Sequence, residues 1–187
     1  MNLFVNAVST QGALFLFDEG RNIIVQEYLE IKGNESSKLP ETIDNFLISH
    51  DIDYSQLDNI VVVHGPGSFT GVRAICLMVS TMAFSTDITL TSMSYFELFS
   101  QYPITKQSSK RDMFMQKSAE ADVEIISNED VVMYLEDNEV GQVYGELPTG
   151  YKGKLVENID YCDIIRQVKL DSLKRVDPLY IKKPNIC

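Results

Sequence analysis

Glycine, hydroxyl and basic residues gather in one stretch of the chain, GPGSFTGVR from Gly65 to Arg73, and residues of these types can bind a phosphate group. Glycines permit backbone conformations that other residues avoid, and the N–H groups at the start of a helix attract anions. The spacing fits neither a P-loop, which needs a lysine here, nor the Rossmann fingerprint, whose last two glycines lie closer together. The pattern therefore favours a tight strand-to-helix turn, capped by Ser68 or Thr70, over a phosphate site.

Elsewhere, the residue types that usually perform catalysis lack the spacing that catalysis needs. The first expected strand ends in Ala7 and Val8, without the carboxylate that an actin-like ATPase or a two-metal nuclease requires there. The two histidines, His50 and His64, do not form a metal-binding pair on one helix. Because no GxSxG pattern surrounds Ser68, it is not expected to be a nucleophile. We predict no catalytic residue and no metal site in this chain.

The elements around the glycine stretch follow from hydrophobic periodicity. Three short strands joined by tight turns are followed by a helix that Ser36 or Ser37 could cap, with Pro40 in its first turn. A β-branched strand then leads into the glycine stretch. The expected order, β-β-β-α-β-α-β-α, is that of the ribonuclease H-like fold and of each actin-like lobe. It comprises strands at 3–8, 13–17, 22–29, 60–64 and 88–91, and helices at 36–49, 70–84 and 94–102.

The second half of the chain has a weaker pattern. The polar stretch 104–111 reads as a linker, which divides the chain into a first lobe at 1–103 and a smaller second lobe at 104–187. Between Ser118 and Tyr151 there are acidic residues and no basic one, which favours a solvated acidic lobe over a docking face for a basic partner. No internal repeat is visible. The elements expected here are strands at 113–115, 123–126 and 142–144, and helices at 129–137 and 159–168.

The expected helix at 70–84 is apolar on nearly all sides. One apolar stripe is expected to pack against the sheet, in the core, and it comprises Val72, Ile75, Cys76, Val79 and Ala83. A second set covers another side and comprises Ala74, Leu77, Met78 and Thr81. Arg73 is the only charged residue of the helix. Such a helix is buried either by a second chain or, as the alternative, under the second lobe.

The composition limits the classes of function. Apolar residues make up 44% of the 187 residues and charged residues 23%, which is typical of a globular protein. A net charge of −11 repels phosphate backbones, so we do not expect the chain to hold RNA or DNA on its own. Three cysteines without a CxxC spacing indicate reduced thiols. Without a signal peptide or a membrane-length apolar stretch, the expected protein is cytoplasmic and makes no membrane contact.

The string GPGSFTGVR resembles the signature of the TsaB (YeaZ) family, GPGSFTGxR, throughout. Further likenesses are Ser9-Thr10 after the first strand, the helix that begins near 35–36, the segment 92–94 and the C-terminal PLYIK at 178–182. The resemblance covers residues 1–102 and 176–183. Two departures are Ala7, where the family usually has aspartate, and a shortened second lobe.

The resemblance implies an actin-like fold of two lobes and a non-catalytic role. The family binds TsaD and, through the TsaB–TsaD pair, the ATPase TsaE. Together these proteins place an N6-threonylcarbamoyl group on adenosine 37 of tRNAs that read ANN codons. The resemblance therefore implies that this chain contacts tRNA only indirectly and holds no cofactor firmly by itself. ATP and Mg would be used by the complex.

The surface expected to meet the TsaD-like subunit is formed by the helices at 36–49 and 70–84. Without the partner, the same surface would form a homodimer. Two alternatives stay open: a nucleotide-binding actin-like enzyme, and a self-associating structural protein. The residues expected to bind the partner are Leu39, Ile43, Phe46, Gly71, Val72, Arg73, Ala74, Leu77, Met78 and Thr81, and the motif loop comprises Gly65, Pro66, Gly67, Ser68, Phe69 and Thr70.

Overall fold

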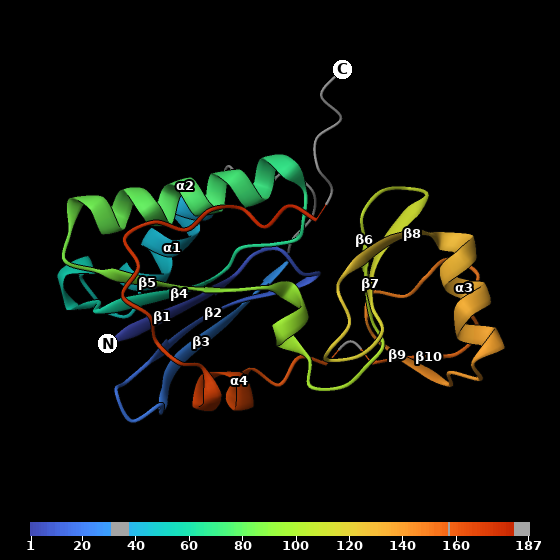
Figure 1. Ribbon diagram of the computed structural model, residues 1–187. Coiled ribbons are helices and arrows are strands. Elements are labelled where there is room, and N and C mark those ends of the chain that lie inside the picture. Colours follow the sequence, from blue (N-terminus) through green and yellow to red (C-terminus); the bar gives the residue numbers. More distant parts are fainter. Residues whose placement is uncertain (31–37, 157, 182–187) are drawn as a thin grey trace, which may run out of the picture. The chain divides into compact units, whose positions relative to one another are not determined.

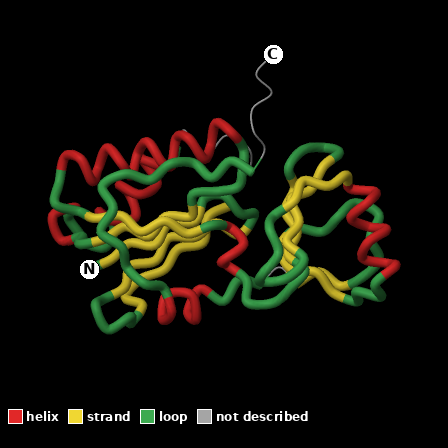
Figure 2. The backbone as a smooth tube through the Cα atoms, in the orientation of Figure 1, coloured by secondary structure: helices red, strands yellow, loops and turns green. Residues whose placement is uncertain are grey.

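The computed structural model describes residues 1–30, 38–156 and 158–181. These residues form two compact units, each a sheet with helices (Figures 1 and 2). Unit 1 comprises Met1–Tyr95 and Tyr161–Leu179, and unit 2 comprises Phe96–Asp160 with the last described residues, Tyr180 and Ile181. No helix in the described ranges is long and apolar enough to cross a membrane.

This division differs from the one at 103/104 that the sequence led us to expect. The chain after unit 2 returns to unit 1, where Tyr161 packs against the rings of Phe4 and Phe15. Further along, Leu173 pairs with Leu90 in an antiparallel bridge. Sequence patterns mark local elements, and they do not reveal that a late segment crosses back to an earlier sheet.

Unit 1 is built on a five-stranded sheet in the order β3-β2-β1-β4-β5. Strand β1 pairs antiparallel with β2 and parallel with β4, so the sheet is mixed. This arrangement confirms the predicted meander followed by crossovers. The elements are β1 (Asn2–Asn6), β2 (Gln11–Phe17), β3 (Ile23–Glu30), α1 (Leu39–Ile48), a 3₁₀ turn (Tyr54–Gln56), β4 (Asn59–Val63), α2 (Phe69–Ser85), β5 (Thr89–Met93), a 3₁₀ turn (Tyr95–Leu98) that runs into unit 2, and α4 (Tyr161–Gln167).

The two faces of this sheet follow from the alternation of side chains along each strand. Leu3 and Val5 of β1 point to the face that α1 and α2 cover (Figure 1). Phe4, between them, points to the other face, where it meets Tyr161 of α4. Strands β1, β2 and β4 are buried on both sides, as is usual for strands flanked by other elements, whereas the edge strand β3 is largely exposed.

Unit 2 repeats the topology of unit 1 in reduced form. Its sheet has the order β8-β7-β6-β9-β10, with β6 antiparallel to β7 and parallel to β9, like β1 between β2 and β4. The connection between β9 and β10, residues 146–153, has no helix where unit 1 has α2. The elements are β6 (Ile104–Gln107), β7 (Asp112–Gln116), β8 (Glu124–Ser127), α3 (Asn128–Asp137), β9 (Gln142–Gly145) and β10 (Lys154–Val156).

Three expectations about elements are wrong or untested. The supposed linker 104–111 begins with β6, whose polar Thr105 and Lys106 are buried. The helix expected at 94–102 is only the 3₁₀ turn Tyr95–Leu98, and β10 was not foreseen. The caps proposed at Ser36 and Ser37 lie outside the described residues. The first flanking residue described for α1 is Lys38, which makes no side-chain cap.

Candidate docking face and glycine loop

The glycine loop joins β4 to α2 in a turn that only glycine fits at its first position. Gly65 has φ = 123°, a conformation that side chains disfavour. A Cβ atom there would lie 3.1 Å from the carbonyl oxygen of Leu179. At Gly67, a Cβ atom would lie 2.9 Å from a methyl group of Val72. The glycines therefore serve close packing, as the strand-to-helix turn interpretation requires.

Ser68 is the N-cap of α2. Its hydroxyl oxygen accepts a hydrogen bond of 3.1 Å from the backbone N–H of Gly71. This settles the choice between Ser68 and Thr70, since Thr70 lies inside the helix. Next to the cap, the Arg73 guanidinium carbon lies 3.8 Å from the centre of the Phe69 ring, a cation–π contact on the exposed side of the first turns.

Helix α2 has one buried side and one exposed side. The buried residues are those of the predicted core stripe, Val72, Ile75, Cys76, Val79 and Ala83, so that prediction is confirmed. On the opposite side, Leu77 is 70% exposed and Phe84 is 90% exposed. We call this side the outer face of α2, and it comprises Arg73, Ala74, Leu77, Met78, Thr81 and Phe84.

Four residues expected on the docking surface lie elsewhere. Leu39, Ile43 and Phe46 of α1 and Val72 of α2 are buried in the core of unit 1. They are therefore not part of an accessible surface. The pattern revealed their apolar character, but the sheet beneath them buries the side that we had assigned to a partner.

Two exposed apolar residues were missed by the sequence analysis. Phe84 follows Leu77 by two helical turns, so the same periodicity that selected Leu77 contains it. Ile48, the last residue of α1, is 71% exposed. No sequence signal separates Ile48 from its buried neighbour Leu47. Both Phe84 and Ile48 add apolar surface on elements that cover the same side of the sheet.

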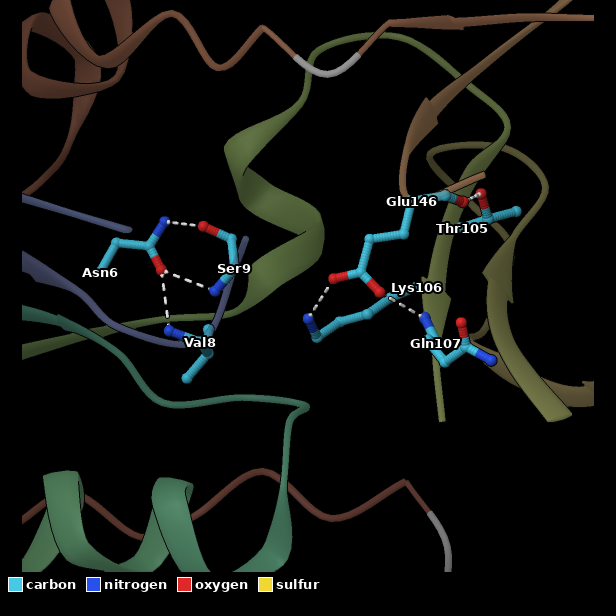
Figure 3. Close-up of polar contacts among 7 residues, drawn as sticks. All are labelled: Asn6, Val8, Ser9, Thr105, Lys106, Gln107 and Glu146. Atoms are coloured by element: carbon cyan, nitrogen blue, oxygen red, sulfur yellow. Dashed lines mark hydrogen bonds and ion pairs between the residues drawn. The ribbon is translucent and has the colours of Figure 1, made fainter. Parts of the chain in front are cut away.

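The end of β1 is closed by its own side chain (Figure 3). The side-chain Oδ1 of Asn6 accepts hydrogen bonds from the backbone N–H groups of Val8, at 3.2 Å, and Ser9, at 3.3 Å. Its amide nitrogen donates to the Ser9 hydroxyl and to the Tyr161 hydroxyl oxygen. From the sequence we expected a nucleotide–metal site to require a carboxylate at this strand end. Here its amides are bonded within the turn and no carboxylate stands at the strand end, so these residues do not fit a nucleotide–metal group.

The two histidines make backbone contacts. His64 Nδ1 lies 2.9 Å from the carbonyl oxygen of Asp177, and a carbonyl only accepts, so Nδ1 carries the proton. His50 Nδ1 lies 2.8 Å from the carbonyl oxygen of Phe46, at the end of α1. Among the described residues, no group of three histidine, cysteine or acidic side chains could hold a metal ion.

Unit 2 has a buried ion pair between Lys106 of β6 and Glu146 of the helix-free connection (Figure 3). The Lys106 ammonium lies 2.9 Å from one carboxylate oxygen of Glu146, and the other oxygen accepts from the backbone N–H of Gln107. Burial lowers the pKa of Lys106, although the Glu146 carboxylate opposes that shift. The pair fastens the connection to β6, which itself pairs through its backbone with β7 and β9.

Parts of the sequence match a known family model and a known relative. A family model described as "TsaD: tRNA N6-adenosine threonylcarbamoyltransferase" matches residues 30–109, less than half of the chain. The "tRNA threonylcarbamoyladenosine biosynthesis protein TsaB" of Bacillus subtilis is 35% identical over 75 residues. The resemblance to the TsaB (YeaZ) family is confirmed. The TsaB match spans 40% of this chain and 33% of the relative.

Two solved structures with YeaZ in their names share the fold. YeaZ from Pseudomonas aeruginosa is 17% identical, with a TM-score of 0.53 over 67% of this chain and 63% of that chain. A protein described as having "similarity to peptidase YEAZ from Pseudomonas aeruginosa" is 15% identical, with a TM-score of 0.63 over 97% of this chain and 99% of that chain. These likenesses confirm the predicted α/β, actin-like fold class.

Proposed function

We propose that this chain is a non-catalytic subunit that binds a TsaD-like enzyme and supports formation of N6-threonylcarbamoyladenosine at position 37 of tRNAs reading ANN codons. The observation that carries this proposal is the outer face of α2. Leu77 and Phe84 lie exposed on a helix whose other side is fully used by the core.

The chemistry of the outer face suits a protein partner. Arg73 is its one charged residue, and charged residues are depleted at the centre of protein interfaces. Met78 adapts its shape easily, which helps packing against a second surface. The Arg73 guanidinium stacks on the Phe69 ring at the edge of this face, and arginine is a residue type that is enriched at protein interfaces.

The end of β1 favours a non-catalytic role over the alternative of a nucleotide-binding enzyme. The bonds from Asn6 to Val8 and Ser9 hold the turn without a ligand, and no step of phosphate chemistry can be derived from these side chains. In our proposal ATP and Mg act in the complex, through a TsaE-like ATPase recruited by the pair. This chain then holds no cofactor firmly by itself.

The charge of the chain supports an indirect role toward tRNA. With a net charge of −11, it repels the phosphate backbone, so we propose that the TsaD-like subunit holds the tRNA and this chain contacts it only indirectly. Such a role places the chain in the cytoplasm. When the partner is absent, the outer face of α2 pairs with a second copy of this chain, since exposed apolar area favours association.

The test is reconstitution with a purified TsaD-like subunit. We expect a tagged copy of this chain to retain that subunit on a column, and modified tRNA to form only when both are present with the TsaE-like ATPase, threonylcarbamoyl donor and ATP, as measured by nucleoside mass spectrometry. Robust ATP hydrolysis by the isolated chain, lost on a point mutation within it, would contradict the proposal. So would modification at full rate without this chain.

A further inference from the structure

A segment near the end of the chain runs beside α2 (Figure 1). We call residues 171–179 the C-terminal strap. It begins at the free edge of β5, where Leu173 and Leu90 exchange two backbone hydrogen bonds, of 2.8 and 3.1 Å. The backbone N–H of Asp171 donates to the Thr91 hydroxyl, and its carbonyl accepts from the Asn59 amide. The strap is therefore anchored on the sheet before it reaches α2.

Lys174 then fastens the strap to the C-terminal end of α2. Its ammonium lies 3.0 Å from the carbonyl oxygen of Ile88, 3.3 Å from that of Thr86 and 3.4 Å from that of Ala83. The last carbonyls of a helix have no partner within the helix and carry a partial negative charge, which a cation stabilises. Because the last turn of α2 contains no basic residue of its own, Lys174 supplies that charge from a distant part of the chain.

The far end of the strap meets the glycine loop at the start of α2. Val176 is buried in the core, and its backbone N–H donates to the Ser80 hydroxyl of α2. The carbonyl of Asp177 accepts from His64, and the backbone N–H of Leu179 donates to the His64 carbonyl. A Cβ atom at position 65 would lie against the Leu179 carbonyl oxygen. The strap is therefore one reason why position 65 requires a glycine.

We propose that the strap is a positioning element for the docking helix, and that Lys174 is its positioning residue. The strap holds α2 near both ends and along the flank that carries Ser80 and Ala83. It leaves the outer face, with Leu77 and Phe84, uncovered. The strap therefore fixes the helix without competing for its partner. This inference rests on the proposed function, since it concerns the surface that meets the TsaD-like subunit.

The test compares three variants of the full chain. Lys174→Met removes the charge and keeps the length of the side chain, whereas Lys174→Arg keeps the charge and donors. Arg175→Met is the matched control, because Arg175 is the neighbouring exposed cation and its ion pair with Asp177 lies within the strap itself. Two readouts are measured: amide hydrogen exchange along α2 and the strap, and the Kd for the purified TsaD-like subunit.

For Lys174→Met we expect exchange in the last turn of α2 and at Leu173 and Val176 to rise about tenfold, and the Kd to weaken about tenfold. Lys174→Arg should restore both readouts, and Arg175→Met should change neither. The positioning role is overturned if the amide exchange rates of Lys174→Met equal those of Arg175→Met. It is also overturned if Lys174→Met raises the exchange rates but leaves the Kd unchanged. If the unmodified chain does not bind the TsaD-like subunit, the proposed function fails, and that result is distinct because it precedes any variant.

Discussion

Ile75 and Leu77 are two positions apart on α2 and point to opposite sides of it, with Ile75 2% exposed and Leu77 70% exposed. Ile75 packs in the core cluster with residues of the sheet. Leu77 has no comparable cover from the part of the chain that the structure describes. One side of α2 thus packs in the core, while a second apolar side is exposed to solvent. The proposed function depends on that second side.

The first prediction contrasts these two residues. We expect Ile75→Ala to lower the free energy of unfolding by about 2–5 kcal/mol, because it leaves a cavity in a packed core. Leu77→Ala should change it by less than about 0.5 kcal/mol, since the side chain is in water. Urea denaturation followed by circular dichroism measures both. Equal destabilisation by the two substitutions would show that the outer face is part of the core.

The second prediction concerns the cap of α2. Ser68→Ala removes the acceptor for the Gly71 N–H and should cost about 1 kcal/mol of unfolding free energy. Ser68→Asp keeps an acceptor and adds a negative charge at the helix start, so it should stay close to the unmodified chain. Thr70→Ala is the matched control, with an expected change under about 0.5 kcal/mol. A larger loss in Thr70→Ala than in Ser68→Ala would assign the cap to Thr70.

The third prediction uses two cysteines with different surroundings. Burial, and then the nearby Asp177 carboxylate, raise the pKa of Cys76 to about 11, whereas Cys162 is exposed. Since the thiolate is the reactive form, iodoacetamide at pH 8 should label Cys162 in the native chain and Cys76 only after unfolding in urea. Peptide mapping by mass spectrometry separates the sites. Labelling of native Cys76 as fast as Cys162 would place α2 outside the core.

The fourth prediction concerns alkaline pH. Burial raises the pKa of Tyr161 to about 12, although the Asn6 and Ser9 hydrogen bonds oppose that shift. The unfolded chain ionises this tyrosine near the ordinary tyrosine pKa of about 10, so the stabilising contribution of the neutral form is complete below that pH and is lost as pH rises to about 12.

Tyr161→Phe has no hydroxyl to ionise, so its unfolding free energy should fall less steeply between pH 10 and about 12 than that of the unmodified chain. At pH 7 the same variant should be less stable, because the buried Asn6 amide loses one of its two hydrogen-bond acceptors and keeps the Ser9 hydroxyl. Urea denaturation at a series of pH values gives both quantities. A variant whose stability falls as steeply as that of the unmodified chain would refute the buried, neutral tyrosine.

Local pattern was enough to predict most of unit 1. The spacing of Val72, Ile75 and Val79 identified the buried side of α2, since a helix under a sheet must place its apolar residues on one side. The glycine stretch between an apolar strand and that helix indicated a tight turn, and Ser68 is its cap.

The remaining features depend on contacts between distant parts of the chain. Thr105 and Lys106 of β6 read as linker residues, because nothing local reveals that Glu146 pairs with Lys106. The repeat of strand order in unit 2 is likewise invisible in the sequence, since topology can recur while side chains differ. The apolar stripe of α1 did not reveal whether the sheet or a partner covers it, and for this reason Leu39, Ile43 and Phe46 were assigned to the wrong surface.

The central claim is that the outer face of α2 binds a TsaD-like subunit, and a charge at its centre tests this most directly. The Kd of Leu77→Glu for that subunit is compared with the Kd of Ile24→Glu, which places the same charge at an exposed apolar position of β3, away from α2. We predict that Leu77→Glu keeps its thermal melt and binds about a hundredfold more weakly, while Ile24→Glu binds normally. Equal binding by the two variants, or unfolding of Leu77→Glu alone, would contradict the account.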